Sequence, residues 1–367
     1  MDVVDAFCGA GGFSAGAMAV GCRVTTGVDR DSVPLKLWAA NTGGRAVNAT
    51  IGRDPVPWPD ARPGLHVHFS PECTPLSKAR SGGASRGEVD AALDAVRACL
   101  ELAVRKGYES WSLENVGTPA VVRLVDEVAA RHPSAVAHTT VDAADYGAPS
   151  CRLRLIASTP ATIRRLKEQP VRRASVADAF AAAGLPLPAE HVRSNTTGRG
   201  GAPSVRSVRQ PSFCVTASHP LTWCDRAGAT VRCLTVAESA CLMGFPSGWQ
   251  LPAGSRAGTR AVGNAVPVPL AAAIMRAAIG EREGTEQDPV VPVVPVPSER
   301  PLADERALLR RALRRLERRV LVLERRSQHR RGSGQAQHRR LNRIHSRAAA
   351  RESSRHGVFP RGFRRIP

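Results

Sequence analysis

Residues 71–77, Pro-Glu-Cys-Thr-Pro-Leu-Ser, place a cysteine between two prolines, directly after the apolar run His66-Val-His-Phe69. Residues 81–87, Ser-Gly-Gly-Ala-Ser-Arg-Gly, follow this loop and predict a flexible stretch. A thiol on a loop that follows a strand is in a typical position for a nucleophile. Cys73 is therefore a candidate catalytic residue, although for such a cysteine taken alone a buried or spare thiol is the commoner explanation.

Two further segments carry charged side chains on short apolar runs. Trp111-Ser-Leu-Glu-Asn-Val116 ends in polar residues, so Glu114 would lie at the same sheet edge as Cys73. Arg152 and Arg154 are two apart on the next such run, and residues with this spacing on a strand point to the same face. Taken alone, Glu114 could instead cap the following helix, and the arginines could lie on a solvated edge.

A glycine-rich turn occupies the N-terminal segment Asp5-Ala-Phe-Cys-Gly-Ala-Gly-Gly-Phe-Ser-Ala-Gly16. A short Val-Val strand precedes it, and an Ala-rich helix follows to about Val20. A strand, a glycine turn and a helix are how a doubly wound sheet receives a nucleotide-like ligand. The spacing is not Gly-x-Gly-x-x-Gly, which disfavours a dinucleotide, and an ordinary βα turn remains the alternative. Asp29 ends the next apolar run and could accept hydrogen bonds from ribose hydroxyls.

The elements that must position these residues are βα units, which continue to about residue 160. Helices are expected over Ala91–Lys106, over Val121–Ala130 and near Val176–Ala183. We therefore expect an α/β, doubly wound, Rossmann-like fold whose sheet edge carries the glycine turn, Cys73 and Glu114.

In this order, the segments resemble those of the DNA (cytosine-5) methyltransferase family. The glycine turn is similar to its S-adenosylmethionine motif, residues 71–77 to its catalytic loop, and Glu114-Asn-Val116 to its Glu-Asn-Val motif. Arg152 and Arg154 match its Arg-x-Arg pair. Leu234–Pro246 and Gly263-Asn-Ala-Val-Pro267 resemble the segment before its last motif and that motif itself. The resemblance covers roughly residues 1–280 and implies an S-adenosylmethionine-dependent methyltransferase fold.

The resemblance also implies roles for individual residues. Cys73 would add to C6 of cytosine, Glu114 would protonate N3, Arg154 would hold O2, Arg152 would support the loop, and Asn115 would fix the local backbone. In a duplex the target base must be flipped out of the stack. The implied contacts with the cofactor are Asp5, Phe7, Cys8, Gly9, Gly11, Gly12, Asp29, Asn264 and Val266, and no metal is expected. Candidate nucleic-acid contacts are Ser77, Arg80, Arg193, Arg199, Arg206 and Arg209.

Three positions depart from the family pattern. Glu72 replaces the usual proline before the cysteine, and a carboxylate there would raise the pKa of the thiol unless it turns away or meets an arginine. Ser150 stands where a glutamine is expected. No acid aligns with the one that would face the adenine of the cofactor near residue 50, and Asp54 is the nearest candidate.

The net charge of +20 predicts a polyanionic partner, DNA or RNA, although a GC-rich genome would itself favour arginine. Residues 298–367 alone hold 21 arginines and six acids. Nine cysteines without paired Cys-x-x-Cys spacing argue against a zinc site or a disulfide framework and suit a reducing cytoplasm, bacterial or phage-infected. We expect neither a signal peptide nor a membrane-spanning segment.

Boundaries follow from composition. We expect a cofactor-binding and catalytic core over 1–160, a reduced target-recognition region over 161–210, and a return to the core over 211–283. A Pro/Val linker over 284–300, a basic amphipathic helix over 301–326 and a basic disordered tail over 327–367 would follow. The apolar seam within 302–323 allows a monomer or a weak dimer.

Other functions stay open at this point. An RNA target is the near rival of DNA, because the family includes a tRNA-methylating relative and the recognition region is short. A weakly active nucleic-acid-binding protein that keeps the fold is a second alternative, suggested by Glu72 and the basic tail. An NAD-dependent oxidoreductase is a distant alternative, since neither the glycine spacing nor the Asn264 segment suits it.

Overall fold

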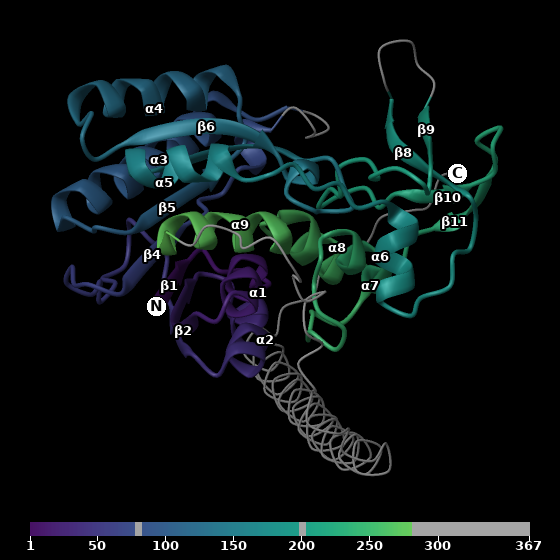
Figure 1. Ribbon diagram of the computed structural model, residues 1–367, viewed down its shortest axis with the longest axis horizontal. Coiled ribbons are helices and arrows are strands. Elements are labelled where there is room, and N and C mark those ends of the chain that lie inside the picture. The colour runs from purple at the N-terminus through teal and green to yellow at the C-terminus, as the bar shows by residue number, and fades with distance from the viewer. Residues whose placement is uncertain (78–82, 198–202, 281–367) are drawn as a thin grey trace, which may run out of the picture. The chain divides into compact units, whose positions relative to one another are not determined.

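A computed structural model describes residues 1–77, 83–197 and 203–280 (Figure 1). The linker, basic helix and tail expected over 284–367 lie outside the described residues. The larger sheet comprises β1 (Asp2–Ala6), β2 (Arg23–Asp29), β3 (Arg45–Asn48), β4 (Leu65–Phe69), β5 (Trp111–Asn115), β6 (Ala137–Asp142) and β7 (Leu153–Ser158).

The strand order of this sheet is β3-β2-β1-β4-β5-β7-β6. Strands β1 to β5 pair in parallel, whereas β7 runs antiparallel to both of its neighbours. The order of successive strands reverses at β1: β2 and β3 lie on one side of it, and β4 and β5 lie on the other. The C-terminal edge at such a switch point is the ligand-binding edge of a doubly wound sheet. The prediction of a Rossmann-like α/β fold is confirmed.

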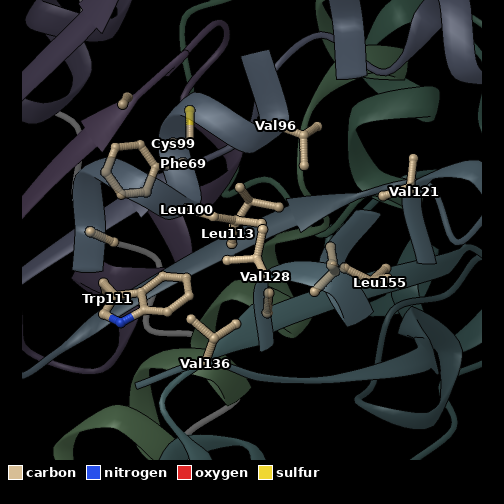
Figure 2. Close-up of a cluster of buried hydrophobic side chains, with 14 of the residues drawn as sticks. Phe69, Val96, Cys99, Leu100, Trp111, Leu113, Val121, Val128, Val136 and Leu155 are labelled. Atoms are coloured by element: carbon tan, nitrogen blue, oxygen red, sulfur yellow. The ribbon is translucent and has the colours of Figure 1, made fainter. Parts of the chain in front are cut away.

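Helices cover both faces of the sheet. They are α1 (Gly12–Ala19), α2 (Ser32–Thr42), α3 (Arg86–Lys106), α4 (Pro119–Arg131), α5 (Pro160–Glu168) and α9 (Val268–Ile279). On one face α3 and α4 pack over β4 and β5, where Leu100, Leu113 and Val128 are fully buried (Figure 2). On the other face α1, α5 and α9 enclose a second apolar cluster that includes Phe13 and Ile274.

The third helix begins earlier than the sequence pattern predicts. Ser85 accepts a hydrogen bond from the backbone of Glu88, and the Glu88 carboxylate bonds back to the Ser85 backbone. This reciprocal capping satisfies donors that a free helix end would leave unpaired, so α3 starts at Arg86 instead of Ala91. Residues 83–87 therefore belong partly to a capped helix, where the sequence predicted only a flexible stretch.

A second, antiparallel sheet has the order β11-β10-β8-β9, formed by β8 (His191–Thr197), β9 (Pro203–Ser207), β10 (Thr222–Cys224) and β11 (Thr230–Cys233). Helices α6 (Val176–Ala182), α7 (Val236–Leu242) and α8 (Ser255–Asn264) share its core, in which Phe180 meets Trp223 edge to face. The expected boundary at residue 210 falls inside this sheet. The 161–210 region thus completes its core with strands from the following segment.

The stretch Ser255–Ile279 is long and apolar enough to span a membrane by composition alone. In the structure it forms two helices, α8 and α9, separated at Ala265-Val266-Pro267. It is largely buried within the protein, where α9 packs against α1 and α5 (Figure 1). Its apolar character is that of a core helix.

Candidate active site

A cavity of about 960 Å³ opens at the C-terminal edge of the larger sheet. It is lined by the ends of β1, β2, β4 and β5, by the first turns of α2 and α3, and by the α8–α9 connection. Segments that are far apart in sequence therefore meet here, because parallel strands bring their carboxyl ends to one edge. Most of the residues predicted to bind cofactor or to act on substrate line this one cavity.

The loop that carries Cys73 is held at two points. The Ser70 N–H donates to the Ala6 carbonyl oxygen at 3.2 Å, and Asn115 Nδ2 donates to the Pro71 carbonyl oxygen at 2.9 Å. Beyond the cysteine, a 3₁₀ turn over Thr74–Leu76 buries Leu76 in the core beside α3. These anchors keep the partly buried thiol at the cavity wall.

Charged side chains from two strands face this thiol. Arg154 Nε lies 2.7 Å from Glu114 Oε1, and both side chains are less than 10% exposed. Burial raises the pKa of Cys73, the positive charge of Arg154 lowers it, and the charge of Glu114 raises it. Burial thus favours the protonated thiol, whereas the guanidinium of Arg154 favours the thiolate.

Arg152 points elsewhere. Its guanidinium donates to the carbonyl oxygens of Val215 and Gly263, both at 2.9 Å. These bonds tie β7 to the end of α8 and to the segment before β10. Arg152 therefore links the segments beneath the site, while Arg154 pairs with Glu114 near Cys73.

Glu72, the unusual residue before the cysteine, pairs with Arg30. Arg30 Nη2 lies 2.6 Å from Glu72 Oε2, and both residues line the cavity. The largest influences on the pKa of Cys73 are burial and the charges of Arg154, Glu114 and Arg152, and Glu72 is not among them. The Glu72 carboxylate thus meets an arginine, which is one of the two arrangements that would keep it from raising the pKa of the thiol.

The glycine turn forms the opposite side of the cavity. The Gly9 N–H donates to Asp29 Oδ2 at 2.8 Å, and the Asp31 N–H donates to Asp29 Oδ1 at 2.8 Å. Phe7 has a φ of +62° and is the only residue other than glycine in the described ranges with a positive φ. A strained backbone held by buried neighbours is common where a protein is shaped to a ligand.

Asp5 brings a buried carboxylate to the same wall. Its Oδ2 accepts from Ser14 Oγ at 2.6 Å, whereas its Oδ1 is buried without a hydrogen-bond partner. Burial raises the pKa of Asp5 to about 7, and the Ser14 hydrogen bonds oppose that shift. An unsatisfied buried oxygen beside a cavity is a site that a ligand donor can complete.

The predicted cofactor residues do not all face the cavity. Asp5, Phe7, Cys8, Gly9, Gly12, Asp29, Asn264 and Val266 line it. Gly11 does not: a Cβ there would lie 2.9 Å from Trp249 and 3.0 Å from Trp38. A Cβ on Gly12 would lie 2.1 Å from the Val266 carbonyl oxygen. These two glycines allow close packing behind the turn, whereas Gly9 borders the open space.

Asp54 does not reach the cavity. Its carboxylate accepts a hydrogen bond from the Thr50 N–H at 2.7 Å, which fixes the turn after β3. Thr50 and Ile51 themselves line the cavity. Recognition of an adenine edge here would fall to the backbone and to the Thr50 hydroxyl.

The candidate nucleic-acid contacts have different surroundings. Arg193 donates to the Gly228 carbonyl oxygen and to Thr230 Oγ1, and Arg206 donates to Cys151 Sγ and lies over the Phe213 ring at 4.3 Å. Both are engaged within the small sheet and its neighbours. Arg209 is exposed, and Ser77 ends the 3₁₀ turn of the cysteine loop. Arg80 and Arg199 lie outside the described residues.

Three charged residues on the rim of the cavity were not singled out by sequence patterns: Arg30, Asp31 and Arg260. Arg30 pairs with Glu72, and Asp31 pairs with Arg260 of α8 at 3.7 Å. Adjacency to Asp29 was the one available signal for Arg30 and Asp31. Within 1–77, 83–197 and 203–280, no cluster of three His, Cys, Asp or Glu side chains could hold a metal ion.

Residues 182–280 match the family model described as C-5 cytosine-specific DNA methylase. No curated protein matches the chain. Among solved structures, the chain is similar over 77% of its length to the whole of an E. coli protein assigned as a DNA modification methyltransferase encoded within a prophage, at 17% identity and a TM-score of 0.52.

Two further structures cover 76% of the chain and 98% of their own length. The Dnmt2 methyltransferase of S. pombe has 15% identity and a TM-score of 0.51, and the Entamoeba histolytica methyltransferase EhMeth has 13% identity and a TM-score of 0.50. At such identities the likeness establishes the fold, a Rossmann-like methyltransferase sheet with one antiparallel strand and a small second sheet. With the family match at residues 182–280, the resemblance of the ordered motifs to the C-5 cytosine-specific DNA methylase family is confirmed.

Proposed function

We propose that the protein is a DNA cytosine-5 methyltransferase, in which Cys73 adds to C6 of the target cytosine and C5 accepts a methyl group from S-adenosylmethionine. The observation that carries the proposal is the grouping of a thiol, a carboxylate and a guanidinium at the cavity. Arg154 and Glu114 form a buried ion pair at 2.7 Å, and both charges act on Cys73.

The glycine-turn side of the cavity fits S-adenosylmethionine. Asp29 has carboxylate lone pairs left for ribose hydroxyls after accepting from two backbone N–H groups. The unpartnered Asp5 Oδ1 suits a cationic or N–H donor, and Asn264 is exposed toward the same space. When bound, the cofactor would supply an electrophilic methyl group.

The chain's own residues would prepare the cytosine. The Cys73 thiol loses its proton to solvent, helped by the charge of Arg154, and its sulfur forms a bond to C6. Electrons of the C5–C6 double bond move into the ring while N3 receives a proton that Glu114 has taken up from solvent, and Arg154 stabilises O2. C5 becomes nucleophilic. After C5 has been methylated, a water molecule takes the C5 proton and the electrons of that C–H bond restore the C5–C6 double bond. The S–C6 bond breaks, which frees the thiolate, and N3 returns its proton to Glu114.

Asn115 and Arg152 would act as positioning residues. Asn115 holds the Pro71 carbonyl oxygen two residues before the nucleophile, and Arg152 fixes β7 against the α8 end. A geometric error of about 1 Å at the reacting atoms can cost on the order of 10²-fold in rate. Such supports explain why polar side chains are buried here.

An RNA substrate is the competing proposal. It is supported by the similarity to the Dnmt2 methyltransferase of S. pombe, which is nearly as strong as that to the E. coli protein assigned as a DNA modification methyltransferase. All nine cysteines are free, which suits the reducing cytoplasm of a bacterial or phage-infected cell for either substrate.

Trapping with a fluorinated base tests the proposal. The protein, S-adenosylmethionine and a duplex DNA carrying 5-fluorocytosine should give a covalent complex, because fluorine at C5 cannot leave as a proton does. Cys73→Ser should abolish the complex, with the matched Cys233→Ser change of an exposed thiol as control. An RNA with the same base is run in parallel. Trapping by Cys73→Ser would refute the role of Cys73, and trapping on RNA alone would replace the DNA proposal.

A further inference from the structure

The cofactor cavity has a charged bridge between its two sides. Arg30 follows Asp29 at the end of β2, and Glu72 precedes Cys73 in the nucleophile loop. Their side chains meet at 2.6 Å, 42 residues apart in sequence, and both line the cavity. The pair therefore joins the ribose-binding edge to the loop that carries the thiol.

The backbone beneath each partner is fixed. Asn48 Nδ2 of the neighbouring strand donates to the carbonyl oxygens of Asp29 and Arg30, at 2.9 and 3.0 Å. On the other side, Asn115 holds the Pro71 carbonyl oxygen next to Glu72. The ion pair thus joins two backbone segments that are each held by hydrogen bonds. The Arg30 guanidinium can therefore determine where the Glu72 carboxylate points.

The pair is half exposed, with side-chain exposures of 62% for Arg30 and 46% for Glu72. Ion pairs of this kind contribute little to folding stability. The pair can still affect the neighbouring thiol. A carboxylate adjacent in sequence to a nucleophilic thiol opposes formation of the thiolate, and pairing with an arginine offsets that charge.

We propose that Arg30 is a positioning residue for the nucleophile: by pairing with Glu72 it turns this carboxylate away from Cys73 and holds the loop against the cofactor cavity. The proposal rests on the proposed role of Cys73. It also explains how the chain can carry glutamate at this position, since Arg30 supplies the compensating charge.

Other charges that face Cys73 are unchanged by a substitution at Arg30. Glu114 on β5, Arg154 on β7 and Arg152 just before β7 act on the thiol through their charges, and Glu88 of α3 lines the same cavity. Because these groups are common to all variants below, a difference in thiol titration reports the Arg30–Glu72 pair.

The test measures the pH dependence of Cys73 alkylation by iodoacetamide in the full chain, read from the Cys73 peptide by mass spectrometry. Arg30→Ala should move the midpoint upward by roughly half a pH unit to one unit, because Glu72 is released. The double variant Arg30→Ala with Glu72→Gln should have a midpoint close to the wild-type value. Arg30→Lys keeps a positive charge, so its midpoint should rise less than that of Arg30→Ala. Arg97→Ala, which removes an exposed ion pair with Glu127 between α3 and α4, is the matched control and should change nothing.

An unchanged midpoint in Arg30→Ala, or a double variant that stays as shifted as the single one, would overturn the proposal. Glu72→Gln, which needs no change at Arg30, provides a second check, because its midpoint should not rise. The titration uses neither cytosine nor cofactor. Its outcome is therefore separate from the trapping experiment, and either result can fail alone.

Discussion

Among single residues, Arg154 allows the most specific prediction about the chemistry. Its planar guanidinium pairs with Glu114 through Nε and faces the thiol, and lysine cannot reproduce that geometry. Arg154→Lys should lower kcat by about 10²-fold or more, the size expected when a stabiliser of developing charge is lost. Cofactor affinity should stay the same, since Arg154 does not line the glycine side of the cavity. Single-turnover methyl transfer and calorimetry would measure the two effects, and full activity in the variant would contradict the assignment.

Substitutions at two glycines of the N-terminal turn should have different effects, one on folding stability and the other on cofactor binding. Gly11→Ala places a Cβ against Trp38 and Trp249 at a φ of +83°, so it should lower the free energy of unfolding by about 1–3 kcal/mol. Gly9→Ala has no neighbour closer than 3.9 Å and borders the cavity. It should weaken cofactor binding by about tenfold, or 1.4 kcal/mol, with a smaller loss of stability.

Urea unfolding and calorimetry on both glycine variants would separate these effects. The resemblance had implied that Gly11 contacts the cofactor. The two indoles that pack against Gly11 come from α2 and from the segment after α7, so no local pattern could reveal them. Equal stability of Gly11→Ala and wild type would restore the original interpretation.

At the level of elements, β4 makes stability depend on pH. His66 and His68 are fully buried on this strand, hydrogen-bonded to Ser110 and Ser112, and His68 stacks on Phe13. Burial lowers the pKa of His66 to about 3 from its ordinary 6.5, and lowers that of His68 as well. Both histidines are neutral in the folded protein, so their contribution is complete above pH 6.5 and is lost as the pH falls toward 3.

Asp5 on the neighbouring strand β1 has the opposite effect on the pH dependence of stability. Its pKa is raised by burial to about 7 from an ordinary 3.8, so its contribution is present below pH 3.8 and is lost as the pH rises to 7. Asp5→Asn should therefore gain stability relative to wild type by about 1.4 kcal/mol per pH unit across that window. Urea unfolding at several pH values, without cofactor and followed by tryptophan fluorescence, would measure the difference. A difference that does not change with pH would contradict the assignment.

The small sheet distinguishes two arginines that sequence reasoning treated alike. Arg206 donates to Cys151 Sγ and to the Pro211 and Ser212 carbonyl oxygens, so Arg206→Ala should cost about 1–3 kcal/mol of stability. Arg209 is exposed, and Arg209→Ala should change stability by less than about 0.5 kcal/mol. If Arg209 contacts a phosphate, its loss should reduce the salt slope of DNA binding by about 0.9. Thermal melts and binding titrations at several salt concentrations would compare the two variants.

For the molecule as a whole, the sequence predicted those features that a single short segment encodes. The strand ends with the glycine turn, Cys73, Glu114 and the arginine pair were predictable, because each motif carries its own apolar strand and parallel strands share an edge. The partners of those residues were not. Arg152 meets carbonyl oxygens 63 and 111 residues away, Arg30 meets Glu72, and β10 and β11 complete a sheet begun by β8. Such contacts depend on the tertiary fold, which a spacing within one segment does not encode.

The C-terminal extension has the largest charge and none of the catalytic motifs. The described fold closes at Gly280, which caps α9 with a φ of +86°, and the 21 arginines of 298–367 lie beyond it. Arginines that neutralise phosphates release counterions, which gives a logarithmic salt slope of about −0.9 per phosphate on duplex DNA. A chain ending at Gly284 should therefore bind DNA more weakly and with a shallower slope, yet keep its melting temperature, cofactor affinity and turnover at saturating DNA. Sedimentation of both chains would test whether 302–323 also mediates a weak dimer. An unchanged slope would show that the extension does not contact DNA, and loss of folding would show that it completes the core.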